Sequence, residues 1–184
     1  MKELSLNILD IAKNSVKADA DTVKIEIDET DDTLEIIISD NGCGMTKELL
    51  ESVTDPFTTT RTTRKVGMGI PLFKMAAEMT GGTFSITSRC RNEFPDNHGT
   101  VTSSLFYKNH IDFTPLGDIV SSVTTLIQGS PDIHWVFSHK TPKGEVELDT
   151  AEIKAVIGDI SLAEPEILVW IKGNLEEQYE AMSN

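Results

Sequence analysis

The sequence lacks a long apolar run, has little positive charge and contains only two cysteines. No stretch of it approaches the length that spans a bilayer, so we expect no membrane-embedded part. The 16 Lys and Arg residues are outnumbered by 30 Asp and Glu residues, and the formal charge of −14 argues against general nucleic-acid binding. Cys43 and Cys90 have no metal-ligand spacing, and the N-terminal segment carries Glu3 and Asp10, unlike a signal peptide. We therefore expect a cytoplasmic protein.

The overall composition is that of a folded protein. With 184 residues, 39% of them hydrophobic, the chain can form one large domain or one domain with a small appendage. The pattern of predicted elements changes after residue 108, and neither a repeat nor a low-complexity linker follows. We therefore expect a first domain over residues 1–108 and a small C-terminal α/β extension over residues 109–184 that packs against it.

Hydrophobic periodicity predicts the order helix, hairpin, helix, helix, hairpin in the first domain. The predicted helices cover residues 3–18, a short segment capped by Thr46, and residues 70–79; the predicted strands cover residues 22–28, 33–39, 83–89 and 100–107. This order predicts a two-layer α/β sandwich with helices on one face of a mixed sheet. In the extension, Asp118 and Asp149 can each cap a helix, with a hairpin between these two helices, and Pro165 can open a last helix.

The first helix presents three polar residues on one side. Asp10, Asn14 and Lys17 are spaced four and three apart, in the polar half of the helix that also holds Asn7 and Lys13. An Asn oxygen is a suitable ligand for Mg²⁺, and a carboxylate one turn earlier could orient or deprotonate a water molecule. The alternative is an ordinary solvated helix face.

A glycine-rich turn follows an Ile-rich strand. Residues 40–45 read Asp-Asn-Gly-Cys-Gly-Met. The carboxylate of Asp40, at the strand end, could accept a hydrogen bond from the exocyclic amine of adenine, while Gly42 and Gly44 would let the backbone approach the base. An ordinary Asn-Gly turn between a sheet and a helix would have the same sequence.

A second pair of glycines, Gly67 and Gly69, flanks Met68 and precedes Ile70 and Pro71. Pro71 suits the first turn of a helix, and the unpaired amides at such a helix start favour anions such as phosphate. A flexible hinge before a helix is the alternative, and the chain has no Walker-type P-loop.

Polar residues complete the pattern on either side of these glycines. Residues 58–65, rich in threonine and without an apolar side chain, could close over a triphosphate, or could simply form a solvated loop. Thr100, directly after Gly99, could place a hydroxyl at the adenine edge or merely start a strand. In this order and spacing, the motifs together predict a pocket for a magnesium-bound nucleoside triphosphate.

With all these motifs present, residues 1–108 resemble the GHKL superfamily of ATP-binding proteins, which have the Bergerat fold. The superfamily includes gyrase, mismatch-repair ATPases, histidine kinases and anti-sigma serine kinases. The resemblance implies ATP and Mg²⁺ as cofactors. Residues 55–61, Asp-Pro-Phe-Thr-Thr-Thr-Arg, are similar to a Pro-Phe-x-Thr-Thr segment of the histidine kinases.

The resemblance also implies a role for individual residues. By position, the nucleotide site would comprise Asn14 as the magnesium ligand, Asp40 at the adenine, and Lys17, Gly42, Gly44, Met45, Phe57, Thr58, Thr59, Gly67, Met68, Gly69, Ile70 and Thr100. The catalytic base would be Asp10, where hydrolytic members have Glu. The Asp carboxylate is withdrawn by about 1.5 Å, and a misplacement of about that size can cost about 100-fold in rate. We therefore expect slow hydrolysis.

The resemblance leaves three hypotheses for function. The chain begins at the ATP domain, so the first is a free-standing signalling protein kinase, similar to histidine kinases or anti-sigma serine kinases, which phosphorylates an unidentified partner protein. The second is an ATP-sensing regulatory module that signals by lid closure without turnover. The third is a weak ATPase, a homodimer in which the extension completes the site of the neighbouring subunit.

Overall fold

A computed structural model describes residues 3–53 and 68–183, which form six strands and six helices. The strands are β1 (Thr22–Glu29), β2 (Thr33–Asp40), β3 (Thr83–Arg89), β4 (Gly99–Tyr107), β5 (His134–Thr141) and β6 (Gly144–Asp149). The helices are α1 (Leu4–Lys17), α2 (Lys47–Val53), α3 (Gly69–Met79), α4 (Ile119–Gly129), α5 (Thr150–Ile157) and α6 (Pro165–Ser183).

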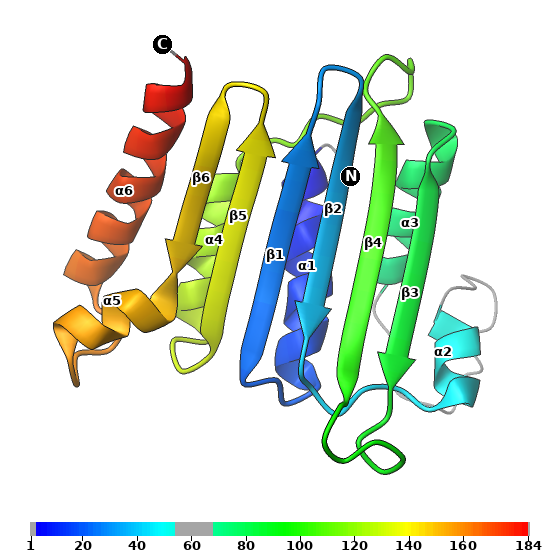
Figure 1. Ribbon diagram of the computed structural model, residues 1–184, viewed down its shortest axis with the longest axis horizontal. Coiled ribbons are helices and arrows are strands. Elements are labelled where there is room, and N and C mark those ends of the chain that lie inside the picture. The colour runs from blue at the N-terminus through cyan, green and yellow to red at the C-terminus, as the bar shows by residue number, and fades with distance from the viewer. Residues whose placement is uncertain (1–2, 54–67, 184) are drawn as a thin grey trace.

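The strands form one mixed sheet in the order β3-β4-β2-β1-β5-β6 (Figure 1). Neighbouring strands are antiparallel, except that β1 and β5 run parallel. Helices α1, α3 and α4 lie side by side on one face of the sheet (Figure 1). The predicted two-layer α/β sandwich with a mixed sheet is therefore confirmed. Strands β5 and β6, which come from the predicted extension, continue this same sheet beside β1.

The hydrophobic core lies between the sheet and the helices. Strands β1 and β2 alternate in burial, and their inward side chains are almost fully enclosed: Val23, Ile25, Ile27, Leu34, Ile36 and Ile38. One detail of the helix prediction is wrong, because Asn7, expected in the polar half of α1, is only 2% exposed. The reason is the central position of α1, which contacts α3, α4 and the sheet.

Local side-chain caps begin two of the helices of the C-terminal part, as predicted. The Asp118 carboxylate accepts a hydrogen bond from the Ser121 amide (2.9 Å), and the Asp149 carboxylate accepts one from the Ala151 amide (2.7 Å). Both caps satisfy amide groups that a helix start leaves unpaired. The boundaries of the predicted elements shift by only one or two residues.

Helix α6 covers the edge of the sheet at β6. The Glu147 amide donates to Oε1 of Gln178 (2.9 Å), and Nε2 of Gln178 donates to the Glu147 carbonyl (3.1 Å). The side-chain amide thus provides the two hydrogen bonds that a further strand would provide. This contact protects the edge from pairing with another chain.

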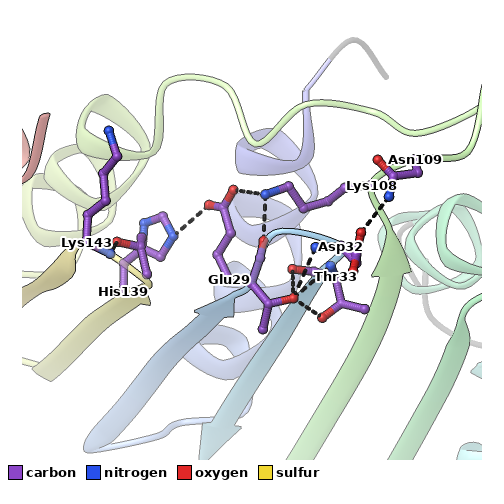
Figure 2. A network of polar contacts seen from close by, with 9 residues as sticks. Glu29, Asp32, Thr33, Lys108, Asn109, His139 and Lys143 are labelled. Carbon is purple, nitrogen blue, oxygen red and sulfur yellow. Dashed lines mark hydrogen bonds and ion pairs between the residues drawn. The ribbon is translucent and has the colours of Figure 1, made fainter.

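A polar network connects strand ends at the edge of the sheet opposite to the one where Asp40 ends β2 (Figure 2). Glu29 accepts hydrogen bonds from Nζ of Lys108 (2.6 Å) and from Nε2 of His139 (3.1 Å), and Nδ1 of His139 lies 2.8 Å from the Tyr179 hydroxyl. An ionised carboxylate only accepts, so neutral His139 carries its proton on Nε2 and accepts the Tyr179 hydrogen on Nδ1. The network therefore joins β1, the end of β4, β5 and α6.

Candidate functional site

A pocket of about 200 Å³ lies at the end of the sheet where β2 finishes and β4 begins. Helix α1, helix α2 and the start of α3 form its walls. Most of its surface is apolar, and a few polar groups converge on it. The lining residues are Ile11, Asn14, Ser15, Lys17, Ala18, Ile38, Asp40, Gly44, Met45, Leu49, Val53, Ile70, Ile86, Thr100 and Thr102.

Asp40, the last residue of β2, is the polar group that the structure fixes most firmly. Its Oδ2 accepts a hydrogen bond from the Ser15 hydroxyl (2.6 Å). Its Oδ1 accepts from the amides of Gly42 (2.9 Å) and Thr100 (3.3 Å). A carboxylate offers about four acceptor positions, so these three donors, the ones found among the described residues, leave one position on Oδ2 for a donor inside the pocket.

A second group of hydrogen bonds supports this arrangement from β3. The Ser88 hydroxyl lies 2.8 Å from the Thr100 hydroxyl and accepts a hydrogen bond from the Met45 amide (2.8 Å). Thr100 is also the partner of Asp40 in the pairing of β2 with β4. The orientation of Thr100 and the path of the chain at Met45 are therefore set by one serine on the neighbouring strand.

The turn that follows Asp40 passes close to two other segments. A Cβ on Gly42 would lie 2.8 Å from the Ala18 carbonyl oxygen, and a Cβ on Gly44 would overlap the Arg89 carbonyl oxygen. Gly44 also has a φ of 65°, in the left-handed region that favours glycine. Both positions need glycine, so the turn packs directly on the end of α1 and the end of β3 while it forms one wall of the pocket.

The polar side of α1 meets the start of α3. Asn14 and Lys17 line the pocket, and Asp10 lies one turn before Asn14 on the same side of the helix. A Cβ on Gly69, the first residue of α3, would lie 3.1 Å from Cβ of Asp10. Among the described residues, no side chain caps α3. The first amides of a helix favour an anionic acceptor.

The structure brings most of the predicted site residues together. Seven of them line the pocket: Asn14, Lys17, Asp40, Gly44, Met45, Ile70 and Thr100. Gly42 supports Asp40 through its amide, and Gly69 adjoins Asp10 without lining the pocket. Met68 is 64% exposed and lies outside the lining. Phe57, Thr58, Thr59 and Gly67 lie outside the described residues.

Three supporting residues were not predicted. Ser15 is not among the residues assigned to the polar half of α1, yet its hydroxyl donates to Asp40. Ser88 lies in β3, which contains several serines and threonines, and the sequence does not distinguish Ser88 from the others. Nδ1 of His98 donates to the Gly42 carbonyl (2.6 Å), which ties the turn after β2 to the loop before β4. Each of these contacts joins residues far apart in the chain, and no local pattern signals such a contact.

Comparison with known proteins identifies the family. Residues 2–110 match the family described as histidine kinase-, DNA gyrase B- and HSP90-like ATPases, which is more than half of the chain. The chain belongs to this family. Every residue that lines the pocket lies within this matched GHKL-type region. The pocket is therefore part of the ATPase-family domain.

Relatives of this GHKL-type domain include sensor kinases. One from Rickettsia conorii, described as an NtrY-like sensor histidine kinase, is 28% identical over 90 residues, which cover 48% of this chain and 15% of the relative. One from Bacillus subtilis, described as a C4-dicarboxylate sensor kinase, is 32% identical over 74 residues, which cover 40% of this chain and 14% of the relative. The chain thus spans about 15% of the length of the curated relatives that it matches.

Solved structures extend the likeness into the C-terminal part. The MutL ATPase domain of Aquifex aeolicus, solved in complex with ADP, superposes with a TM-score of 0.55 at 15% sequence identity. The superposition covers 85% of this chain and 69% of that one. At this identity the likeness shows the fold, and its coverage is larger than the region that matches the family.

Among the described residues, no helix is long and apolar enough to cross a bilayer.

Proposed function

We propose that this chain binds ATP in the pocket between α1, α2 and the start of α3, with the adenine held at Asp40. The observation that carries this proposal is the acceptor position on Oδ2 of Asp40 that no described residue fills, in a pocket whose surface is mostly apolar. The exocyclic amine of adenine is a donor that fits this position. The apolar side chains of Ile38, Met45 and Ile86 provide surfaces for the flat base.

The triphosphate would extend from the adenine toward Asn14 and the start of α3. The uncapped amides at that helix start and the ammonium group of Lys17 favour anions. These groups matter because the chain as a whole carries a formal charge of −14, which opposes the binding of an anionic nucleotide.

Magnesium fits the donor groups at this site. No group of three or more His, Cys, Asp or Glu side chains in residues 3–53 and 68–183 could hold a metal ion. Mg²⁺ needs no such cluster, because it retains several waters and binds through one or two protein oxygens together with phosphate oxygens. Asn14 would supply the protein oxygen, and the bound ion would neutralise part of the phosphate charge.

We further propose that the bound ATP serves phosphate transfer to a side chain of a partner protein. The two curated relatives described as sensor kinases support this reaction class. In the transfer, an acceptor atom of the partner would attack the γ-phosphorus, the bond to the bridging oxygen would break, and ADP would leave. Asp10, beside the start of α3, would orient the acceptor and take its proton where the acceptor is a hydroxyl.

ATP sensing without transfer is the second candidate. The exposure of Asp10 favours it, because a solvated carboxylate is poorly placed to control a proton. Incubation with γ-labelled ATP and the proteins that co-purify with this chain would separate the two candidates. Label that appears on a partner supports transfer, whereas tight ATP binding without any labelled product supports sensing.

The first experiment is a calorimetric titration of the protein with ATP and Mg²⁺, repeated with Asp40→Asn. An amide has a single acceptor oxygen in place of two, so it cannot satisfy Ser15, the two backbone amides and adenine together. We expect ATP binding to weaken by about 100-fold, since a hydrogen bond to a charged group contributes about 1.5–3 kcal/mol. Asp28→Asn, an exposed carboxylate on the open face of β1, is the matched control and should bind like the unmodified protein. Equal affinity in Asp40→Asn and the control would contradict the proposed adenine site.

A further inference from the structure

A groove of about 590 Å³ lies at the C-terminal corner of the molecule, away from the nucleotide pocket. Strand β6, helix α5 and helix α6 surround it, at the end of the sheet opposite β3 (Figure 1). The groove is lined by Glu147, Leu148, Asp149, Glu152, Ile153, Val156, Ile157, Ile167, Trp170 and Asn174. Its floor is apolar, and its carboxylates come from β6 and α5.

The apolar side of α6 is wider than the part that the fold buries. Leu168, Ile171 and Leu175 are buried against the rest of the molecule. Ile167, which packs partly against the core, and Trp170, three residues later, extend this apolar side into the groove, where Trp170 remains 55% exposed. From α5, Val156 faces the same groove and is 87% exposed. A large aromatic side chain beside exposed aliphatic ones is typical of a binding surface.

The charge around the groove favours a basic occupant. Residues 144–183 contain ten acidic and two basic side chains. Among the described residues, neither Glu147 nor Glu152 takes part in an ion pair, whereas Asp149 is engaged by His134 (2.7 Å). A second copy of this chain, with its own charge of −14, would be repelled here.

The hydrogen bonds of β6 indicate the form of the occupant. The main chain of Glu147 is already satisfied by Gln178, so an extended peptide cannot add to this edge as another strand there. The floor of the groove offers apolar side chains. An occupant must therefore bring a backbone whose own hydrogen bonds are complete, and a helix meets this condition.

We infer that the groove between β6, α5 and α6 docks an amphipathic helix of a partner protein, with apolar side chains on Trp170 and Val156 and with Lys or Arg side chains facing Glu147 and Glu152. This surface is separate from the nucleotide pocket and does not depend on ATP binding. It would allow a partner to be held while the pocket remains open.

The test uses a fluorescein-labelled synthetic peptide of about 18 residues, with Leu at helical spacing and Lys elsewhere, titrated with the full chain and followed by anisotropy. We expect saturable one-to-one binding and a change in the emission of Trp170, the exposed one of the two tryptophans. Binding should weaken several-fold when salt rises from about 50 to about 500 mM, because the charges lie at the rim. A peptide with the same composition in scrambled order, and one with Glu in place of Lys, serve as ligand controls.

Two valines on exposed helix surfaces provide a matched pair of variants. Val156→Asp, inside the groove, and Trp170→Ala should each weaken binding by about tenfold or more. Val169→Asp, equally on the surface at 73% exposure but outside the lining, should bind like the unmodified protein. Circular dichroism and the melting temperature of each variant show that it is folded. Glu152→Lys tests the charge of the groove separately and should weaken binding of the Lys peptide more than Glu26→Lys on β1 does.

Three results would overturn the inference. The first is equal binding of the ordered and scrambled peptides, or equal binding of the Lys and Glu peptides. The second is equal loss of binding in Val169→Asp and Val156→Asp. The third is the absence of peptide binding; if the chain then also self-associates and Val156→Asp abolishes this, the occupant is a second copy of this chain.

Discussion

At the scale of single residues, the orientation of Asp40 depends on donors from three separate elements. Ser15 belongs to α1, Gly42 to the turn after β2, and Thr100 to β4. The motif 40–45 was sufficient to predict that Asp40, Gly42 and Gly44 lie together in one turn, because these residues are close in sequence. The serine contact could not be predicted, since it spans 25 residues and a buried serine looks like any small residue of a helix.

Ser15→Ala tests whether the orientation of Asp40 matters for the nucleotide. Removal of this hydroxyl takes away the donor on Oδ2, the oxygen that we propose for adenine. We expect ATP to bind about five- to tenfold more weakly, which corresponds to the roughly 1 kcal/mol typical of one hydrogen bond. Calorimetric titration with ATP and Mg²⁺ measures the change, and the thermal midpoint shows whether the fold has been altered.

Ser104→Ala is the matched control for that substitution. Ser104 is also buried, but its hydroxyl has no hydrogen-bond partner among the described residues. Its removal should leave ATP affinity unchanged and should leave stability unchanged or slightly higher, because an unsatisfied buried hydroxyl carries a desolvation cost. A loss of affinity in Ser104→Ala equal to that in Ser15→Ala would show that the effect comes from general loosening of the core.

At the scale of elements, helix and strand periodicity predicted the twelve elements to within a few residues. The alternation of apolar and polar residues in β1 and the capping residues Asp118 and Asp149 are local signals, so they can be recognised without knowledge of the tertiary structure. The order of the strands was not predictable in the same way. The pairing of β5 with β1 joins residues more than 100 positions apart, and no local pattern specifies that partner.

Helix α6 contains a glycine that its packing does not require. Gly173 lies in the helix interior, and a Cβ there would meet nothing within 4 Å. Gly173→Ala should therefore stabilise the protein by about 0.5–1 kcal/mol, because alanine loses less backbone entropy in a helix. The melting temperature should rise by about 1–4 °C for a chain of this size.

Gly158→Ala is the contrasting substitution. The space around Gly158 is equally open, but its φ of 65° lies in the left-handed region. Alanine there should destabilise the protein by about 1 kcal/mol. Thermal unfolding of both variants separates the two effects: opposite signs are expected, and a common sign would mean that backbone conformation does not decide the outcome.

At the scale of the whole molecule, the ATPase-family region and the residues after it share one sheet. Strand β5 pairs with β1 over seven residue pairs, and α4 packs on α1. The network of Glu29, His139 and Tyr179 adds a polar connection between β1, β5 and α6. These contacts attach the C-terminal corner to β1, which lies beside the strand that carries Asp40.

His139 makes this connection sensitive to pH. Burial lowers the pKa of His139 below its usual value of 6.5, although the neighbouring Glu29 partly opposes the shift and Lys108 adds to it. The unfolded chain binds a proton near pH 6.5, whereas the folded chain does so only at lower pH. The stability that this histidine contributes is thus fully present above about pH 6.5 and is lost as the pH falls toward and through the folded-state pKa. Urea unfolding between about pH 7.5 and 5.5 should show this loss.

His139→Gln isolates the contribution of the imidazole, because a glutamine can donate to Glu29 and accept from Tyr179 without titrating. Its stability should fall less between about pH 7.5 and 5.5 than that of the unmodified protein. Tyr179→Phe keeps the histidine and removes the hydrogen bond from the Tyr179 hydroxyl to Nδ1 of His139, so it should lower stability by about 1 kcal/mol while it preserves the pH dependence. If His139→Gln and the unmodified protein lose stability in parallel, acid acts on other groups and the connection between β1 and α6 does not respond to pH.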